Sequence, residues 1–267
     1  MDAGSSDADA PVLMDKSDGV ARVQLNRPKQ FNALSEELLG GLRAAMDDIA
    51  VDESVRCVVL SAAGKAFCAG HDLREMRAKS GLDYYQDLFS QCSAVMQRIQ
   101  DLQVPVIARV HGVATAAGCQ LVASCDLAIA SRSARFAVSG INVGLFCSTP
   151  AVALSRNVSN KRAFDLLVTG RFIEAETAAD WGLVNEAVPD VDLDSAVAGK
   201  VRAILGKSPA ALRCGKAMYY KQRQMALADA YELAADVMAR NMMEEDAAEG
   251  IDAFLDKRAP VWTLSST

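Results

Sequence analysis

The sequence PVIARVHGVATAAGCQLVASCDLAIA spans residues 105–130 and contains the pattern that decides the fold. Its apolar run at 106–110 is short and rich in β-branched residues, which predicts a buried strand. The His-Gly pair at 111–112 predicts a turn, and the small residues at 116–123 predict the start of a helix. A second apolar run at 127–130 predicts another strand, so strand, loop and helix alternate. This alternation indicates an α/β layered fold.

The same alternation extends toward the N-terminus. Residues 20–25 alternate in polarity and predict a strand that ends in a turn. Ser35 precedes two glutamates and a run of leucines at helical spacing, which predicts a helix that begins at this residue. Residues 57–60 predict a buried strand, and apolar residues at helical spacing predict a second long helix through residues 85–99.

From about residue 160 onward the pattern is almost wholly helical, and no linker rich in proline or serine interrupts it. One core domain with a helical extension therefore fits better than two independent domains. We expect helices over 161–168, 174–181 and 209–243. We expect a disordered acidic tail over residues 1–17, a core over 18–200 and a C-terminal helical region over 201–267.

Composition excludes several classes of protein. The chain has 267 residues, of which 51% are hydrophobic and 23% charged, as in a globular protein with a real core. The net charge of −6 argues against a nucleic-acid partner, because such proteins present a broad basic surface. No apolar run approaches the roughly 18 residues of a membrane span, so we expect a soluble protein.

Cysteine usage bears on metals and on location. The seven cysteines are odd in number and contain no CxxC pair, which indicates reduced thiols rather than a disulfide framework or a zinc site. The first ten residues lack the apolar core of a secretory signal and the arginines of a transit peptide. We therefore expect a cytoplasmic protein with no metal and no cofactor of its own.

Two segments of small residues have the same expected local arrangement. The segment AFCAGHDL at 66–73 and the segment at 116–123 each follow an expected strand and expose backbone N–H groups near a helix start. Two such donors aimed at one point form an oxyanion hole, which stabilises negative charge on a carbonyl or thioester oxygen. The alternative is that both segments are ordinary tight connections.

The amino-acid sequences of these two segments resemble the paired signatures of the crotonase, or enoyl-CoA hydratase/isomerase, family. The resemblance continues through RPKQFNAL at 27–34, LVTGRFIEAETAADWGLVNEAVP at 167–189 and EGIDAFLDKRAPVW at 249–262. More narrowly, AAGCQLVASCD and NVGLFCSTP are similar to the mitochondrial enoyl-CoA hydratase domain-containing proteins, in particular the third type of that series.

The resemblance implies a spiral of ββα turns with C-terminal helices, assembled as trimers or pairs of trimers. It implies an acyl-CoA thioester as substrate, with coenzyme A as part of that substrate. The thioester oxygen would lie between the backbone amides of His71 and Ala117, and Ala69 and Gly118 would stand beside them in the binding site. The His71 imidazole would then pack or line the pocket.

Coenzyme A carries several phosphate charges, and the matching family positions include basic residues here. They are Arg27 and Lys29 in the first loop and Arg74 after the first oxyanion segment. Phe254 and Lys257 match C-terminal positions that often reach the CoA of a neighbouring subunit. Each basic residue could equally be a solvated surface charge, since exposed ion pairs are common and weak.

The family pattern fails at the two glutamates that act as acid and base in hydration. Their positions hold Gln120 and Gly140, neither of which exchanges a proton near neutral pH. Each general acid or base contributes about 10² to 10⁴ in rate, so fast hydration is not expected unless another group substitutes. The other polar candidates on these segments are Asp72, Ser139, Asn142, Cys147, Ser148 and Thr149.

Two of these candidates carry alternatives. Asp72 can cap its loop or act as a base, and Cys147 can be a buried thiol or a nucleophile with a lowered pKa.

The leading interpretation is an acyl-CoA enzyme, similar to enoyl-CoA hydratases, that uses an oxyanion hole without the glutamates. Isomerisation, thioester hydrolysis and decarboxylation remain open reactions, and the second interpretation is a catalytically quiet acyl-CoA binder. We expect that restoring glutamates at 120 and 140 together raises hydration of crotonyl-CoA.

Overall fold

A six-stranded sheet forms the centre of the computed structural model, which describes residues 9–263. Its strands lie in the order β1 (Val12–Ser17), β2 (Val20–Leu25), β3 (Cys57–Ala62), β4 (Val106–Val110), β6 (Leu127–Ser131) and β9 (Glu186–Val188). β1 is antiparallel to β2, and every other pairing in this sheet is parallel. The strands expected at 20–25, 57–60, 106–110 and 127–130 are confirmed.

A smaller sheet receives the strands that follow β4 and β6. It consists of β5 (Val113–Thr115), β7 (Arg135–Ala137) and β8 (Ile173–Glu174). β4 is thus followed by β5 of the small sheet and β6 by β7, and helix α4 (Ala117–Ser124) follows β5. This is the expected mixed α/β spiral with a helical C-terminal region.

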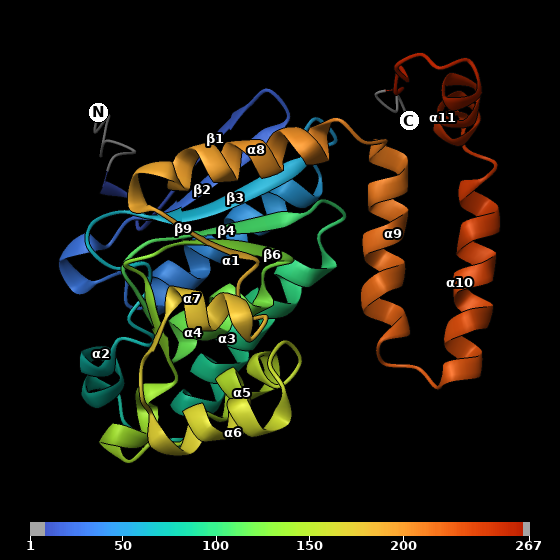
Figure 1. The fold of residues 1–267 in the computed structure, drawn as a ribbon. Helices are drawn as coiled ribbons and strands as arrows, with labels where there is room; N and C mark the ends of the chain where they lie inside the picture. The colour runs from blue at the N-terminus through green and yellow to red at the C-terminus, as the bar shows by residue number, and fades with distance from the viewer. Residues whose placement is uncertain (1–8, 264–267) are drawn as a thin grey trace, which may run out of the picture.

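Helices cover both faces of the large sheet (Figure 1). α1 (Glu36–Ala50) and α3 (Leu82–Asp101) lie on one face, and α8 (Leu193–Leu205) lies on the other. Val58 of β3 packs on the side of α1, and its neighbour Val59 packs on the side of α8. Burial on both faces explains why the strand sequences are continuously apolar.

The helix expected at Ser35 begins there. The Ser35 side-chain oxygen accepts a hydrogen bond from the Leu38 amide at 3.1 Å and caps α1. The remaining short elements around the core are η2 (Pro28–Gln30), α2 (Leu73–Ala78), η3 (Ser139–Val143), α5 (Ser148–Leu154), α6 (Asn160–Thr169), α7 (Ala175–Asp180) and η4 (Asp190–Asp192). None of the helices within residues 9–263 is long and apolar enough to cross a membrane.

A C-terminal arm of three helices stands beside the core (Figure 1). It consists of α9 (Pro209–Gln222), α10 (Leu227–Asn241) and α11 (Glu245–Leu255). The single helix expected over 209–243 is therefore two helices joined at 223–226. The α9 residue Lys216 is buried against the core, where its ammonium group binds the carboxylate of Asp126 at 2.6 Å.

Both expected domain boundaries shift. Of the expected tail, residues 1–8 lie outside the described residues, and residues 12–17 form β1 rather than disordered chain. The reason is a hairpin: Asp18 and Gly19 both have positive φ, as a two-residue turn between β1 and β2 requires. At the other boundary α8 runs through residue 200, so the arm begins after Gly206.

Candidate functional site

A cavity of about 300 Å³ opens where the loop after β3 and the start of α4 meet the segment 139–150. Its walls include Phe89 from the middle of α3. The remaining lining residues are Ala69, His71, Leu73, Met76, Ala116, Ala117, Ser139, Gly140, Val143, Leu145, Phe146, Cys147, Ser148, Thr149 and Pro150. The two small-residue segments therefore meet at one cavity.

Two glycines allow this close approach. A Cβ atom on Gly118 would lie 2.2 Å from the carbonyl oxygen of Cys68, so α4 can pack against the loop only with glycine here. Gly70 has a φ of +92°, and a Cβ there would lie 2.9 Å from the Cβ of Ala116 and 3.4 Å from the amide nitrogen of Ala117. The chain just before His71 thus contacts the chain at Ala117.

The backbone of His71 is oriented by a bridge to Leu34. The Leu34 amide donates to the carbonyl oxygen of Gly70 at 2.8 Å, and the Asp72 amide donates to the carbonyl oxygen of Leu34 at 3.1 Å. In such a bridge the groups flanking His71 face Leu34, so the His71 amide faces the opposite side. Within residues 9–263, that amide donates no backbone hydrogen bond.

The amide of Ala117 belongs to the first turn of α4, where N–H groups have no intrahelical acceptor. The preceding residue Ala116 has φ 50° and ψ −121°, a conformation that costs a residue other than glycine about 1 to 3 kcal/mol. A hydrogen bond from the Ala116 amide to the carbonyl oxygen of Ala137, at 3.0 Å, holds this conformation. Two N–H groups at one cavity can bind an oxygen that gains negative charge.

The His71 imidazole is buried, and neither of its nitrogens has a hydrogen-bond partner among the described residues. The ring packs edge-on against Phe89, with 5.3 Å between the ring centroids. Burial lowers the pKa of His71 to about 4, so the imidazole is neutral at pH 7. His71 therefore contributes an apolar contact and its backbone rather than a charge.

Because the native pKa of His71 lies below the unfolded value of about 6.5, protonation favours the unfolded chain. The stability that this group contributes is complete above pH 6.5 and is lost as the pH falls toward 4. We expect the free energy of unfolding to fall more steeply in wild type than in His71→Gln over this range, by about 2 to 3 kcal/mol. Urea unfolding at several pH values measures this difference, and equal slopes in the two proteins would contradict it.

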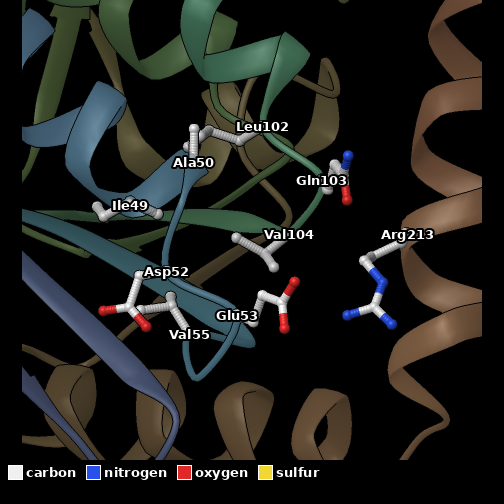
Figure 2. Close-up of a pocket in the computed structure, with 9 residues that line it drawn as sticks. All are labelled: Ile49, Ala50, Asp52, Glu53, Val55, Leu102, Gln103, Val104 and Arg213. Carbon is white, nitrogen blue, oxygen red and sulfur yellow. The ribbon is translucent and has the colours of Figure 1, made fainter. Parts of the chain in front are cut away.

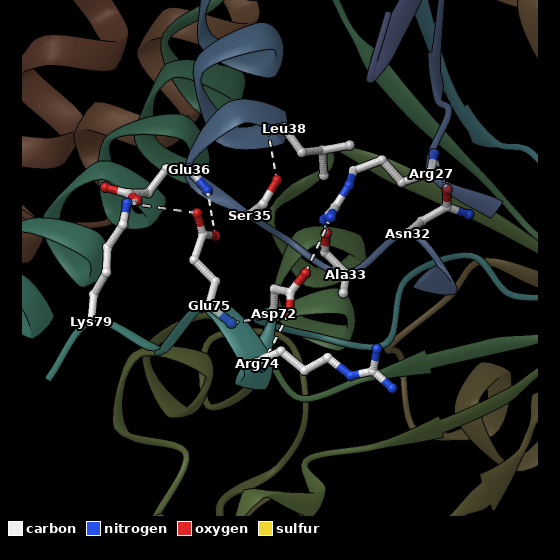
Figure 3. Close-up of polar contacts among 10 residues, drawn as sticks. All are labelled: Arg27, Asn32, Ala33, Ser35, Glu36, Leu38, Asp72, Arg74, Glu75 and Lys79. Carbon is white, nitrogen blue, oxygen red and sulfur yellow. Dashed lines mark hydrogen bonds and ion pairs between the residues drawn. The ribbon is translucent and has the colours of Figure 1, made fainter. Parts of the chain in front are cut away.

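Arg27 forms a partly buried ion pair with Asp72, the residue that follows His71 (Figure 3). The Arg27 guanidinium lies 3.2 Å from the Asp72 carboxylate and also donates to the carbonyl oxygen of Ala33 at 2.7 Å. Asp72 caps α2 by accepting hydrogen bonds from the amides of Arg74 and Glu75. In this structure Arg27 thus supports the loop that carries His71, and Asp72 acts as a cap and anchor.

The other predicted phosphate contacts are exposed. Lys29 and Arg74 lie on the surface near the first loop and α2, and the Arg74 guanidinium points away from the Arg27–Asp72 pair in Figure 3. Phe254 in α11 is 82% exposed, and Lys257 is exposed just beyond that helix. Figure 1 shows α11 near the start of α9 and far from α2 and α5, so the chain does not bring these two residues to its own cavity.

The two positions expected for glutamates have different surroundings. Gln120 lies inside α4, 5% exposed, and its side-chain oxygen has no hydrogen-bond partner among the described residues. Gly140 lines the cavity, whereas Gln120 does not. A Cβ on Gly140 would lie 2.5 Å from the carbonyl oxygen of Leu145 and 2.7 Å from the Cys147 sulfur. The segment 140–147 therefore fills the space of a side chain at 140.

A hydrogen bond holds the Cys147 side chain beside Gly140. Its sulfur accepts a hydrogen bond from the Gly140 amide at 3.3 Å, and burial raises the pKa of its thiol. A raised pKa disfavours the thiolate and argues against a nucleophile. Of the other candidates, Ser139 shares a hydrogen bond of 2.7 Å with Thr115, and Asn142 donates to the carbonyl oxygen of Gly170.

Among the described residues, no Asp, Glu, Lys or Arg lines the cavity. No group of three or more His, Cys, Asp or Glu side chains within residues 9–263 is placed to hold a metal ion. Sequence reasoning missed the apolar wall at Leu73, Met76 and Phe89. The helical periodicity of α3 indicated only that Phe89 faces other protein, which gave no signal that separates a cavity from the core.

A second cavity, of about 210 Å³, separates the core from α9 (Figure 2). It lies between the end of α1, the segment at 102–104 and Arg213 of the arm. Figure 2 shows the side chains of Glu53 and Arg213 extending into it from opposite sides. This cavity follows from the way α9 contacts the core, and it contains neither oxyanion segment.

Comparison with known proteins identifies the family of the chain. The family model described as Enoyl-CoA hydratase/isomerase matches residues 15–265. The mitochondrial enoyl-CoA hydratase domain-containing protein 3 of Xenopus laevis is 44% identical over 95% of this chain and 86% of its own length. The human protein of that name is 44% identical over 95% of this chain and 84% of its own length.

Solved structures agree with this placement. An enoyl-CoA hydratase from Mycobacterium smegmatis has 57% sequence identity and a TM-score of 0.93, covering 94% of this chain and 98% of that one. Human enoyl-CoA hydratase domain-containing protein 3 has 44% identity and a TM-score of 0.92, covering 94% of this chain and 100% of that one. The expected spiral α/β fold is confirmed.

The expectation of a cytoplasmic location is contradicted, because relatives at 42 to 44% identity from frog, rat, mouse and human are named mitochondrial proteins. It rested on the composition of the first ten residues and on the free thiols, and buried thiols indicate only a reducing environment, which is not unique to the cytoplasm.

Three findings indicate the same family. They are the family match over residues 15–265, the sequence relatives and the solved structures with the same fold. Sequence identity of 44% to the type 3 proteins also confirms the narrower resemblance. The chain belongs to the enoyl-CoA hydratase/isomerase family, the crotonases.

Proposed function

We propose that the chain binds an acyl-CoA thioester in the 300 Å³ cavity, with the thioester oxygen between the amides of His71 and Ala117. The observation that carries this proposal is the contact of Gly70 with Ala116 and Ala117, which brings both backbone segments to one cavity. The strained backbone of Ala116 supports it, because strain of this kind persists at sites where the surrounding structure enforces it.

Fast hydration by the paired-glutamate mechanism is not part of this proposal. No described carboxylate lines the cavity, Gln120 is buried behind it, and His71 is neutral. A reaction that needs only stabilisation of a thioester enolate or oxyanion fits the cavity better. Among residues 9–263 no Asp, Glu, Lys or Arg lines the cavity, and burial makes the His71 imidazole a weak base with a pKa of about 4, which equally favours a second candidate, a quiet acyl-CoA binder.

Binding through the thioester oxygen can be tested with an ester that has no double bond to hydrate or isomerise. Butyryl-CoA and its thioether analogue S-butyl-CoA differ in the carbonyl oxygen, and calorimetry gives the dissociation constant of each. Two hydrogen bonds of about 0.5 to 1.5 kcal/mol each predict that the thioester binds about 5- to 150-fold more tightly. Equal affinities would contradict the oxyanion assignment.

Turnover separates the enzyme from the quiet binder. Purified protein is incubated with enoyl-, 3-hydroxyacyl- and malonyl-type CoA esters, and the products are followed by mass spectrometry. Any new product, formed faster than in buffer, identifies the reaction class. Binding of the esters with no product across the whole panel would support the binder and exclude the enzyme for these substrates.

The structure changes the expected result of restoring the glutamates. Gly140→Glu would drive a Cβ into the carbonyl oxygen of Leu145, so we now expect the double variant with Gln120→Glu to lose stability rather than gain hydration. Gly140→Ala isolates the cause and should cost about 1 to 3 kcal/mol in urea unfolding. Gly215→Ala is the control, because a Cβ there meets nothing within 4 Å. Equal stability of the two alanine variants would show that segment 140–147 yields freely.

We also propose that the chain assembles with further copies through its arm. Leu227, Tyr231, Met238 and Met242 are each more than half exposed and share one stripe of α10. Assembly as a trimer or pair of trimers would cover this stripe. Sedimentation velocity should give such a mass for wild type and a smaller mass for Tyr231→Glu with Met238→Glu. The exposed Glu232 provides the control variant Glu232→Ala, and a monomeric wild type would refute the proposal.

Phe254 and Lys257 then have a role that one chain alone does not give them. In an assembly the end of one arm reaches another copy, and these two exposed residues would contact the CoA bound there. Lys29 and Arg74 would contact the same CoA from the chain that holds it.

A further inference from the structure

The side chain of Asn32 is buried between the loop at 27–34 and the chain that follows β3. It is 0% exposed and makes three hydrogen bonds, each to a backbone atom. Its oxygen accepts from the Arg27 amide at 2.8 Å (Figure 3). Its Nδ2 group donates to the carbonyl oxygens of Ala63 and Ala66, at 2.8 Å each. Asn32 thus joins this first loop to the chain that leads into the first oxyanion segment.

The backbone of the first loop explains why an asparagine stands at this position. Phe31 and Asn32 have φ values of +50° and +54°, in the left-handed region that residues other than glycine rarely adopt. Asparagine is several-fold enriched in this region, and its side-chain amide both donates and accepts hydrogen bonds. Glycine would adopt the same backbone conformation but would supply no hydrogen bond, so the position depends on the side chain.

Two further contacts attach the rest of the first oxyanion segment to the same loop. The Ala69 amide donates to the carbonyl oxygen of Phe31 at 3.1 Å, and Leu34 forms the bridge on either side of His71. Asn32 lies between Phe31 and Leu34 in the sequence, and its own bonds hold the chain where the segment begins. The segment that carries the His71 amide is therefore bound to the first loop along its length.

We propose, on the basis of the function proposed above, that Asn32 is a positioning residue for the oxyanion site. Its amide holds the first oxyanion segment against the first loop and so fixes where the His71 amide points. Asn32 does not line the main cavity, so it acts through the backbone and not on the ligand itself. An oxyanion donor must lie about 2.7 to 3.1 Å from the oxygen, and a small displacement of the segment weakens that bond.

Asn32→Gly tests this role, because glycine keeps the left-handed backbone and removes all three side-chain hydrogen bonds. The readout is the dissociation constant of S-butyl-CoA divided by that of butyryl-CoA, measured by calorimetry on folded protein. We expect this ratio to fall about 2- to 12-fold, the share of one of two hydrogen bonds to the thioester oxygen. The affinity for S-butyl-CoA, which lacks that oxygen, should change less than twofold.

Asn157→Gly is the matched control. The Nδ2 group of Asn157 also donates to two backbone carbonyl oxygens, those of Ala123 and Ala153 at 2.9 Å each. These bonds lie toward the end of α4 that is remote from Ala117. Both variants should unfold at a lower urea concentration than wild type, but only Asn32→Gly should change the ratio. If Asn32→Gly does not fold, Asn32→Asp fills the same space without the donor, and the ratio should fall in the same way.

The outcomes separate this inference from the proposed function. An unchanged ratio in the folded variant would overturn the role of Asn32, and so would an equal loss of affinity for both ligands. A wild type without preference for the thioester would refute the oxyanion proposal and remove the basis of this inference. Hydrogen exchange tests the attachment without any ligand: the Ala69 amide should exchange faster in Asn32→Gly than in Asn157→Gly. Equal exchange would show that Asn32 does not hold the segment.

Discussion

Gly118→Ala should be among the most damaging single substitutions in this chain. The added Cβ would lie 2.2 Å from the carbonyl oxygen and 2.8 Å from the carbonyl carbon of Cys68, both backbone atoms that cannot rotate away. The helix α4 and the loop before Gly70 must therefore separate. We expect a loss of about 3 kcal/mol in the free energy of unfolding, measured by urea denaturation, despite the better helix propensity of alanine.

The same displacement moves the Ala117 amide, because Ala117 directly precedes Gly118 in α4. Binding of butyryl-CoA should therefore fall by tenfold or more, under conditions where the variant is still folded. Gly40→Ala is the matched control: Gly40 lies in α1 with nothing within 4 Å of its Cβ position. That substitution should stabilise the protein by about 0.5 to 1 kcal/mol and leave binding unchanged. Unaltered stability and binding in Gly118→Ala would refute this account of how the two segments meet.

Lys216→Met should release the arm from the core. Lys216 is 9% exposed, and its ammonium group donates to the carbonyl oxygens of Ile99 and Val104 as well as to Asp126. Burial lowers the pKa of Lys216, yet three oxygens within 3.0 Å compensate the loss of water. Methionine preserves the length of the side chain and leaves the Asp126 carboxylate without its cation.

Breaking a buried ion pair by removing one partner costs about 3 to 5 kcal/mol. Asp126 keeps two other hydrogen bonds, from Tyr220 at 2.8 Å and the Val106 amide at 2.6 Å, so we expect about 3 kcal/mol. Hydrogen exchange should quicken throughout α9 while α1 and α3 keep their protection, because Lys216 and Tyr220 of α9 both bind the core through the Asp126 carboxylate.

Arg240→Met supplies the control for this result. Arg240 pairs with Asp236 on the exposed surface of α10, four residues apart. Exposed pairs of this kind contribute about 0.3 to 0.5 kcal/mol, so stability and exchange should barely change. If Lys216→Met behaved like Arg240→Met, the buried pair would not be what fixes the arm.

The sequence predicted most of the core because local signals and burial agreed there. Ser35 placed the start of α1, and continuous apolar runs marked β3, β4 and β6 as strands buried on both faces. β1 was missed although its signal was present: Asp18-Gly19 is a strong hairpin turn, but the polar residues around it read as a tail.

The site was predicted less completely, for a physical reason. Glycine at 118 and small residues at 69 and 117 revealed where backbone groups come close, since few residues permit such contact. The use of Arg27 to anchor Asp72, 45 residues away, and the approach of Cys147 to Gly140 depend on tertiary packing. No periodicity or spacing encodes contacts of that kind.

The packing of Cys147 against Gly140 also limits which substitutions position 140 can accept. At position 140, where the family resemblance leads us to expect a glutamate, an added side chain meets the backbone of Leu145 and the sulfur of Cys147 at once. A glutamate introduced at 140 alone would destabilise the fold, so the segment 140–147 would have to change before that glutamate could transfer a proton. A carboxylate at position 140 is therefore incompatible with the present positions of Leu145 and Cys147.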